Sequence, residues 1–168
     1  SLKPFERLHF DVLQITPACR STLKYVLVII DDFSRFNRIY PIHKKSDSIS
    51  KILSFLNKIK IKTGITPAYL HSDCGGKFSS TYFLNKISEL NFSVERGPAD
   101  NPQINGISEC FNSTLLTKMW WILAQASIPL NLRDEVAKYA STLINILASK
   151  SLNWSSPVSI LAGISSCI

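Results

Sequence analysis

Long apolar runs are missing from this chain. The longest, YVLVII at residues 25–30, is far shorter than the roughly 20 residues that a membrane-spanning helix needs. The first ten residues, SLKPFERLHF, lack the apolar core of a signal peptide and resemble the cut edge of a longer protein. We therefore expect no membrane association.

Cysteine is also scarce, with four residues at Cys19, Cys74, Cys110 and Cys167 and no C-x-x-C pair. This spacing argues against a zinc knuckle and suggests no disulfide framework. It is typical of a protein in a reducing compartment.

Acidic residues are almost absent between positions 35 and 62. This stretch has eight bases and one acid, Asp47, whereas the rest of the chain has 11 bases and 11 acids. The net charge of +7 therefore lies in one segment. Such a segment suits a polyanionic partner such as nucleic acid, or it is simply the solvated face of a helix.

The composition is that of an ordinary globular domain. The 168 residues are 45% hydrophobic and 18% charged, without repeats or low-complexity linkers, so one domain with a sizeable core is expected.

The pattern of apolar residues predicts alternating strands and helices. Strands are expected at residues 8–15, 25–30, 38–42, 68–71 and 92–95. Helices are expected from Ser46 or Ser48 to Thr63-Gly64, from Ser79-Ser80 to about Leu90, over about 107–124 and about 132–148, and in a short segment after Trp154. Residues 97–106, GPADNPQING, are expected to form a loop. This order favours an α/β fold with a five-stranded mixed sheet flanked by helices.

Three acids occupy positions that burial alone would not select. Asp11 lies inside an apolar strand, Asp73 follows a short strand, and Glu109 lies near the start of the long helix. A carboxylate within a strand is costly unless it is paired, hydrogen-bonded or bound to a metal. Three converging carboxylates form the oxygen-rich site that Mg²⁺ prefers, and two such ions can support phosphoryl transfer.

Each acid also has a structural interpretation. Asp73 could form an Asx turn before Gly75-Gly76, and Glu109 could be a favourable acid near a helix N-terminus. Asp31 and Asp32 are interpreted as turn and helix-cap residues, and His71 as a core residue beneath the sheet.

The spacing of the three acids, with 35 residues between Asp73 and Glu109, resembles the retroviral-type integrase catalytic core and, more closely, its copia-type retrotransposon branch. The blocks LHFDVLQITP, YVLVIIDDFSRFNRIYPIHKKSDS, HSDCGGKFSSTYF and PADNPQINGISECFNSTLL are similar to that family's blocks and occur in the same order. The tail LASKSLNWSSPVSILAG is similar too, so the resemblance spans nearly the whole chain.

The resemblance implies a ribonuclease-H-like fold and DNA strand transfer, in which a DNA 3′-hydroxyl attacks a phosphodiester. It implies two Mg²⁺ or Mn²⁺ ions, with Asp11 as the shared ligand, Asp73 completing one site and Glu109 the other. It places Gln103 and Asn105 in a loop that touches the DNA end, and Asn112 one helical turn beyond Glu109. Lys44, Lys45, Lys51 and Lys58 are candidates for phosphate contacts.

The chain departs from the family pattern at Lys77, where an acid is usual, and at Cys110 and Ser113, where arginines are usual. These departures define an alternative, a catalytically decayed integrase-derived domain that binds nucleic acid. A ribonuclease-H-like nuclease of another family is a third possibility.

The resemblance further implies double-stranded DNA as partner, a homo-oligomer, and location in the nucleus with a cytoplasmic virus-like-particle stage. Residues 1–168 would be the catalytic core of a longer polyprotein. A zinc-binding domain would be expected before Ser1 and a further C-terminal domain after Ile168.

Overall fold

A computed structural model describes residues 1–15, 23–72, 81–89, 95–96 and 102–162. The strands are β1 (Arg7–Gln14), β2 (Tyr25–Asp31), β3 (Asn37–Ile42), β4 (Tyr69–Ser72) and β5 (Glu95–Arg96). The helices are α1 (Asp47–Thr63), α2 (Thr81–Glu89), α3 (Pro102–Gln125), α4 (Arg133–Ile146) and α5 (Pro157–Ala162). Short 3₁₀ turns cover Leu130–Leu132 and Lys150–Leu152.

The strands form one mixed sheet in the order β3-β2-β1-β4-β5. The first three strands are an antiparallel meander, and β4 lies parallel to β1. Among the described residues, the fifth strand comprises only Glu95–Arg96 at the sheet edge, so β1 to β4 make up almost all of the described sheet. Because a parallel pair needs a crossover, α1 connects the meander to β4, as the order of elements predicted.

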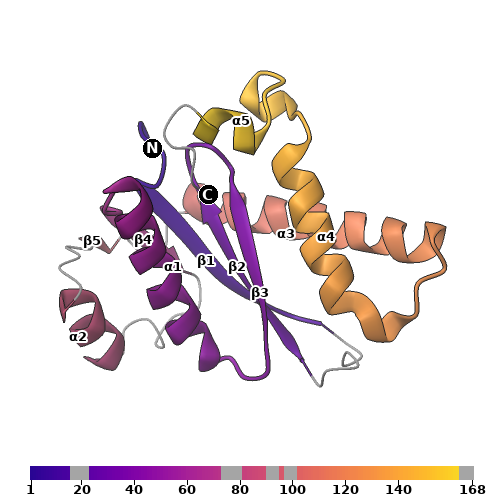
Figure 1. The fold of residues 1–168 in the computed structure, drawn as a ribbon, viewed down its shortest axis with the longest axis horizontal. Helices are drawn as coiled ribbons and strands as arrows, with labels where there is room; N and C mark the ends of the chain where they lie inside the picture. The colour runs from indigo at the N-terminus through magenta and orange to yellow at the C-terminus, as the bar shows by residue number, and fades with distance from the viewer. Residues whose placement is uncertain (16–22, 73–80, 90–94, 97–101, 163–168) are drawn as a thin grey trace.

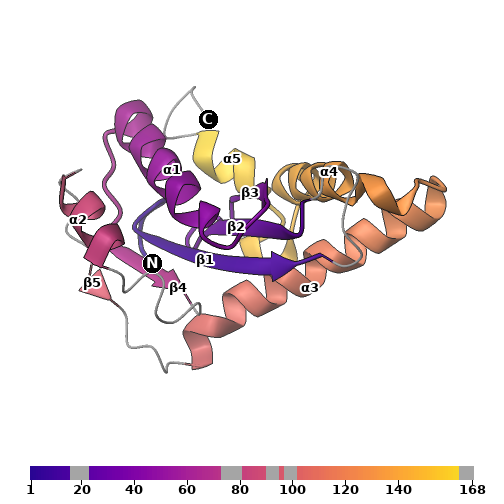
Figure 2. The same ribbon diagram turned by 90° about the horizontal axis from the view of Figure 1, so that it is seen from below.

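Alternation along the strands divides the core into two layers. Leu27 and Ile29 pack with α1 on one face of the sheet, whereas Val26, Val28 and Ile30 pack with α3 and α4 on the other. Figures 1 and 2 show this arrangement, with the sheet between α1 and the α3–α4 pair. A central strand that is buried on both faces explains the continuous apolar run at residues 25–30.

The C-terminal end of α1 is as the sequence predicted, but the capping of its N-terminus is not. Gly64 adopts a left-handed φ of 69° and its N–H donates to the Lys60 carbonyl, which is the helix end that the sequence predicted. Ser46 occupies the N-cap position but makes no side-chain capping bond. The Ser48 hydroxyl instead donates to the Lys45 carbonyl, so neither predicted serine caps the helix.

Residues 102–106, which were predicted to belong to a loop, instead form the start of α3. The helix begins at Pro102, so Gln103, Asn105 and Gly106 are helical and only residues 97–101 remain outside the described part. Proline at the first helical position needs no N–H partner and has a φ already suited to a helix, whereas the sequence interpretation counted it as a breaker. Glu109 consequently lies about two turns into α3 rather than in its first turn.

Not every apolar residue of α3 and α4 is buried. Cys110 on α3 is exposed, and Tyr139 on α4 is 56% exposed. The face of α4 that packs on the sheet instead presents small residues, including Ala137 and Ala140, which allow close approach. None of the helices that the structure describes is long and apolar enough to span a membrane.

Candidate active site

Asp11 is a half-buried carboxylate in the middle of β1, on the face of the sheet that α3 covers. Its Oδ1 accepts a hydrogen bond from its neighbour's backbone, Val12 N–H, at 2.7 Å. Its Oδ2 accepts from the Asn112 side-chain amide at 2.5 Å. Asp11 is therefore oriented from two sides, as a strand-borne carboxylate with a functional role would need to be.

Asn112 ties α3 to β1. Its Nδ2 donates to Asp11, while its buried Oδ1 has no hydrogen-bond partner among the residues that the structure describes. Glu109 is exposed and lies three residues earlier in α3. Residues three apart share a helix face, so Glu109 lies one turn from the residue that contacts Asp11. Asn112 thus lies beside Asp11, and its contact with DNA stays a prediction.

The remaining site predictions fall partly outside the described residues. Asp73 lies in the segment 73–80, which the structure does not describe, so its position relative to Asp11 and Glu109 stays a prediction. The backbones of Gln103 and Asn105 belong to the first turns of α3, and their side chains are outside the described part. Among described residues, no group of three His, Cys, Asp or Glu side chains is close enough to hold a metal ion.

The four candidate phosphate-binding lysines, Lys44, Lys45, Lys51 and Lys58, are exposed around the start and along the length of α1. The Lys45 ammonium lies 5.6 Å from the centre of the Tyr25 ring, a cation–π distance. They lie on the side of the sheet that carries α1, whereas Asn112 approaches Asp11 from the side that carries α3. Contacts by these lysines would therefore be made away from the carboxylates.

Asp31 is the last residue of β2 and Asp32 begins the predicted turn after it, but neither caps a helix. Asp31 is buried and accepts hydrogen bonds from Phe5 N–H at 2.7 Å and from the Ser34 hydroxyl at 2.6 Å. Burial raises the pKa of Asp31, and the hydrogen bonds from Ser34 and Phe5 oppose this increase. These hydrogen bonds show that Asp31 holds Phe5 and Ser34 at the turn rather than forming part of a metal site.

A buried polar cluster that the sequence did not predict lies beside β1. His9 and His71 are opposite one another in the β1–β4 ladder, with ring centres 5.5 Å apart. His9 Nε2 lies 3.6 Å from Asp32 Oδ1, too long for a direct hydrogen bond but within electrostatic range. The His9 imidazole holds the pKa of Asp32 well below its usual range despite burial. The core position predicted for His71 is confirmed.

Comparisons with known proteins agree with this architecture. A family model described as the integrase core domain matches residues 1–102. The chain is 27% identical over 165 residues to the Retrovirus-related Pol polyprotein from transposon RE1 of Arabidopsis thaliana, covering 98% of this chain and 11% of that protein. It is 30% identical over 134 residues to the corresponding polyprotein from transposon TNT 1-94 of Nicotiana tabacum, covering 80% and 10%. The chain thus spans about a tenth of these relatives.

Among solved structures, the chain is similar to the HTLV-2 integrase catalytic core domain in complex with magnesium (trimeric form). The TM-score is 0.68 at 21% identity, and the match covers 95% of this chain and 98% of that one. This likeness establishes the ribonuclease-H-like fold of integrase cores. Together with the family match and the plant relatives, it leads to one conclusion: the chain belongs to the integrase core domain family, and its resemblance to copia-type retrotransposon integrase cores is confirmed.

Proposed function

We propose that this chain catalyses metal-dependent DNA strand transfer as the core of a retrotransposon integrase, with Asp11, Asp73 and Glu109 as its catalytic carboxylates. One observation supports this most strongly. The described part of the parallel β1–β4 ladder ends with the pair Phe10 and Ser72, and the residues that follow these two in the sequence are Asp11 and Asp73. Chain connectivity therefore favours neighbouring positions for these two carboxylates.

The third carboxylate comes from α3. Because Asn112 binds Asp11, the turn of α3 that carries Glu109 is held against β1. The donor set is entirely oxygen, which suits Mg²⁺ or Mn²⁺. The buried, unpartnered Asn112 Oδ1 adds a further hard acceptor at the same place. When bound, such ions supply the positive charge that favours ionisation of a nucleophilic hydroxyl and stabilises a leaving oxygen.

The residues of this chain would act mainly by binding and orientation. Asp11, Asp73 and Glu109 would hold the ions, and Asn112 would fix the Asp11 carboxylate. Gln103 and Asn105 would contact the DNA end from the start of α3, and the α1 lysines would bind phosphates without reading sequence. The reaction joins a DNA 3′-hydroxyl to a target phosphorus and releases the target's own 3′-oxygen, so no covalent protein–DNA bond is required.

The wider setting belongs to the same proposal. We place residues 1–168 as one catalytic core domain within a longer Pol-type polyprotein, with double-stranded DNA as partner and a homo-oligomer as the working unit. The trimeric form named for the HTLV-2 core and the span of about a tenth of the plant relatives support this setting. Nuclear location, preceded by a cytoplasmic particle stage, follows from integration into host DNA.

The test is disintegration of a branched DNA substrate, which an isolated core can perform, in Mg²⁺ and in Mn²⁺. Asp73→Asn and Glu109→Gln should reduce the rate by roughly 100-fold or more, because each removes a charge that holds an ion. Glu135→Gln is the matched control, since Glu135 is exposed and its side chain pairs with Lys138 in α4. Equal rates for Asp73→Asn and the parent chain would refute the proposal.

The second candidate function is nucleic-acid binding by a catalytically decayed, integrase-derived domain. Cys110, which follows Glu109, and Ser113, which follows Asn112, are exposed on α3 and carry no charge, so this part of α3 attracts DNA less than an arginine-bearing one. Calorimetric titration with Mn²⁺ separates the two candidates. Heat of Mn²⁺ binding that disappears in Asp11→Asn supports the catalytic function. DNA binding without any Mn²⁺ binding supports the decayed, DNA-binding domain.

A further inference from the structure

Helix α3 carries an exposed aromatic residue on the same side as the candidate active site. Leu116 and Trp120 lie within about 20° of Glu109 around the helix axis, because each residue of an α-helix advances by about 100°. Leu116 is 38% exposed and Trp120 is 53% exposed. These three residues form one exposed line along α3, the outer stripe. Figure 2 shows α3 running past β1 to the turn that joins it to α4.

The Trp120 ring is held in one orientation. Its centre lies 5.1 Å from the guanidinium carbon of Arg133 at the start of α4, which is a cation–π distance. Arg133 is buried, whereas Trp120 is exposed. One face of the ring is therefore covered by a fixed cation, while much of the ring is presented to solvent. Because the ring is ordered before any ligand arrives, the entropic cost of stacking a ligand on it is reduced.

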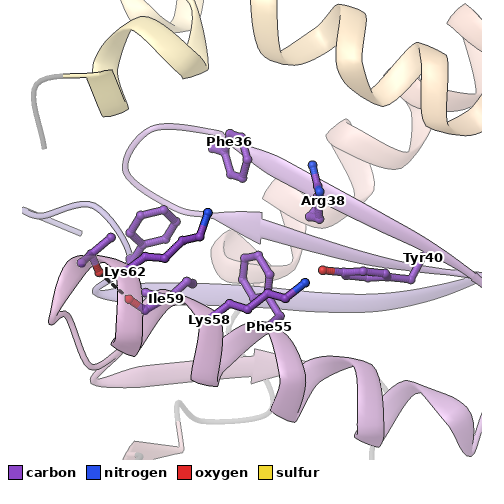
Figure 3. A pocket seen from close by; sticks show the side chains of 9 residues that line it. Phe36, Arg38, Tyr40, Phe55, Lys58, Ile59 and Lys62 are labelled. Carbon is purple, nitrogen blue, oxygen red and sulfur yellow. Dashed lines mark hydrogen bonds between the residues drawn. The ribbon is translucent and has the colours of Figure 1, made fainter. Parts of the chain in front are cut away.

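The surface between Glu109 and Trp120 offers little attraction to phosphates. The exposed residues of α3 between these two are all uncharged, namely Cys110, Ser113, Thr114, Leu116 and Thr117. Ion pairs with a DNA backbone are therefore not available from them, whereas an aromatic ring can stack on any base. The pocket between β3 and α1 (Figure 3) takes no part in this surface, because it lies on the other face of the sheet.

We infer that Trp120 stacks on an unpaired base of the DNA strand whose 3′-hydroxyl lies at the carboxylates, an inference that rests on the proposed strand-transfer function. Trp120 lies about 16 Å from Glu109 along the helix axis, and a stacked DNA strand rises about 3.4 Å per nucleotide. The base would therefore be about five nucleotides from the reacting end, or fewer in an extended strand. It must be unpaired, because a base inside a duplex is already stacked on its neighbours.

The first test uses the fluorescence of the ring itself. The chain has three tryptophans, so Trp121→Phe combined with Trp154→Phe leaves Trp120 as the single one. A duplex with a five-nucleotide 3′ extension should quench the emission of this variant in a saturable way, since the indole would then be stacked on a base. The blunt duplex, and a duplex whose extension contains only abasic sites, should leave the emission nearly unchanged.

The second test measures affinity for the extended duplex by fluorescence anisotropy of a labelled strand, without divalent metal. Trp120→Ala should weaken binding about tenfold, and Trp120→Phe, which keeps an aromatic ring, should weaken it less. Trp121→Ala is the matched control, because Trp121 is 64% exposed on the same helix but is turned about 100° away from Trp120. It should stay within about twofold of the parent. Binding of the blunt and abasic duplexes should be the same in all of these variants.

Four results would overturn the inference. The first is no saturable quenching of the single-tryptophan chain by the extended duplex. The second is equal quenching by the abasic extension, because the contact would then not involve bases. The third is an equal loss of affinity in Trp121→Ala. The fourth is a Trp120→Ala variant that binds DNA like the parent but sediments as a smaller species, which would make Trp120 a contact between copies of the chain.

The outcome is separable from that of the proposed function, because binding is measured without metal and needs no reaction. Metal-dependent disintegration that Asp73→Asn abolishes, together with unchanged DNA binding in Trp120→Ala, would refute the stacking alone. Base-dependent quenching of Trp120, together with equal disintegration by Asp73→Asn and the parent chain, would refute the proposed catalytic role and leave the stacking in place.

Discussion

At the scale of single residues, Asn112 is the described side chain on which the geometry of Asp11 depends. It supplies the one side-chain hydrogen bond to this carboxylate that the structure describes, at 2.5 Å. Asn112→Ala should weaken Mn²⁺ binding and slow disintegration by about 10- to 100-fold, as the loss of a group that orients a metal ligand usually does. Calorimetry and the branched-substrate assay measure these effects.

Thr114 offers a matched control for that experiment. It is exposed on the same helix, and its hydroxyl donates to the Cys110 carbonyl within α3. Thr114→Ala should leave both measurements within about twofold of the parent. If Asn112→Ala behaves like Thr114→Ala, Asn112 does not position Asp11 for metal binding.

The lowered pKa of Asp32 predicts how the stability of the fold depends on pH. Its pKa is lowered in the folded chain, mainly by His9, so the unfolded chain binds its proton more tightly. The carboxylate therefore stabilises the fold above its unfolded pKa of about 4, and this contribution is lost as the pH falls below that value. Urea unfolding from about pH 6 to about pH 3 should show a steeper loss for the parent chain than for Asp32→Asn. Parallel curves would contradict this assignment.

At the scale of elements, α4 is attached to β3 by a buried amide pair. Asn145 Oδ1 accepts from the backbone N–H and the side-chain amide of Asn37, at 2.9 and 2.7 Å, and Asn145 Nδ2 donates to the Asn37 carbonyl at 2.8 Å. The Ser141 hydroxyl completes the network by donating to Asn37 Oδ1 at 2.6 Å. Polar groups at a helix–sheet interface fix the register because no other alignment satisfies them.

Asn145→Ala should therefore destabilise the fold by about 3 kcal/mol, since it leaves several buried groups of Asn37 unpaired. For a chain of this size we expect the melting temperature to fall by about 6–12 °C. Lys138→Ala, which removes an exposed ion pair with Glu135 on the same helix, should cost less than about 1 kcal/mol. Thermal unfolding followed by circular dichroism measures both changes. A loss in Asn145→Ala no larger than that in Lys138→Ala would show that the amide pair does not stabilise the fold.

At the scale of the whole molecule, the uneven charge predicts the salt dependence of DNA binding. If Lys44, Lys45 and Lys51 contact phosphates, the affinity for duplex DNA should fall steeply with salt. Replacing one of them by alanine should reduce the slope of log K against log salt by about 0.9. An unchanged slope for all three variants would show that α1 lies away from the DNA. Lys138→Ala, on the opposite side of the sheet, serves as the control.

Several features could be predicted from the sequence because they depend on local pattern. The apolar segments of β1 and β2, the helical stripe of α1 and the glycine that ends it are local, and the structure has them within one or two residues. The spacing of Asp11, Asp73 and Glu109, together with the ordered sequence blocks around them, was sufficient to identify the family. The long apolar run of β2 also indicated a strand buried on both faces.

Other features were decided only by tertiary structure. Pro102 begins α3 instead of breaking it, and α3 lies where Asn112 reaches Asp11 across 101 residues of sequence. The pairing of His9 with His71 and the attachment of Asn37 to Asn145 join residues that no periodicity relates. The sequence by itself determined most of the helices and strands and singled out the candidate carboxylates, because both follow from residue type and spacing along one chain. Only the packing of helices on the sheet decided which side chains meet, because burial and hydrogen bonding select among contacts that are distant in sequence.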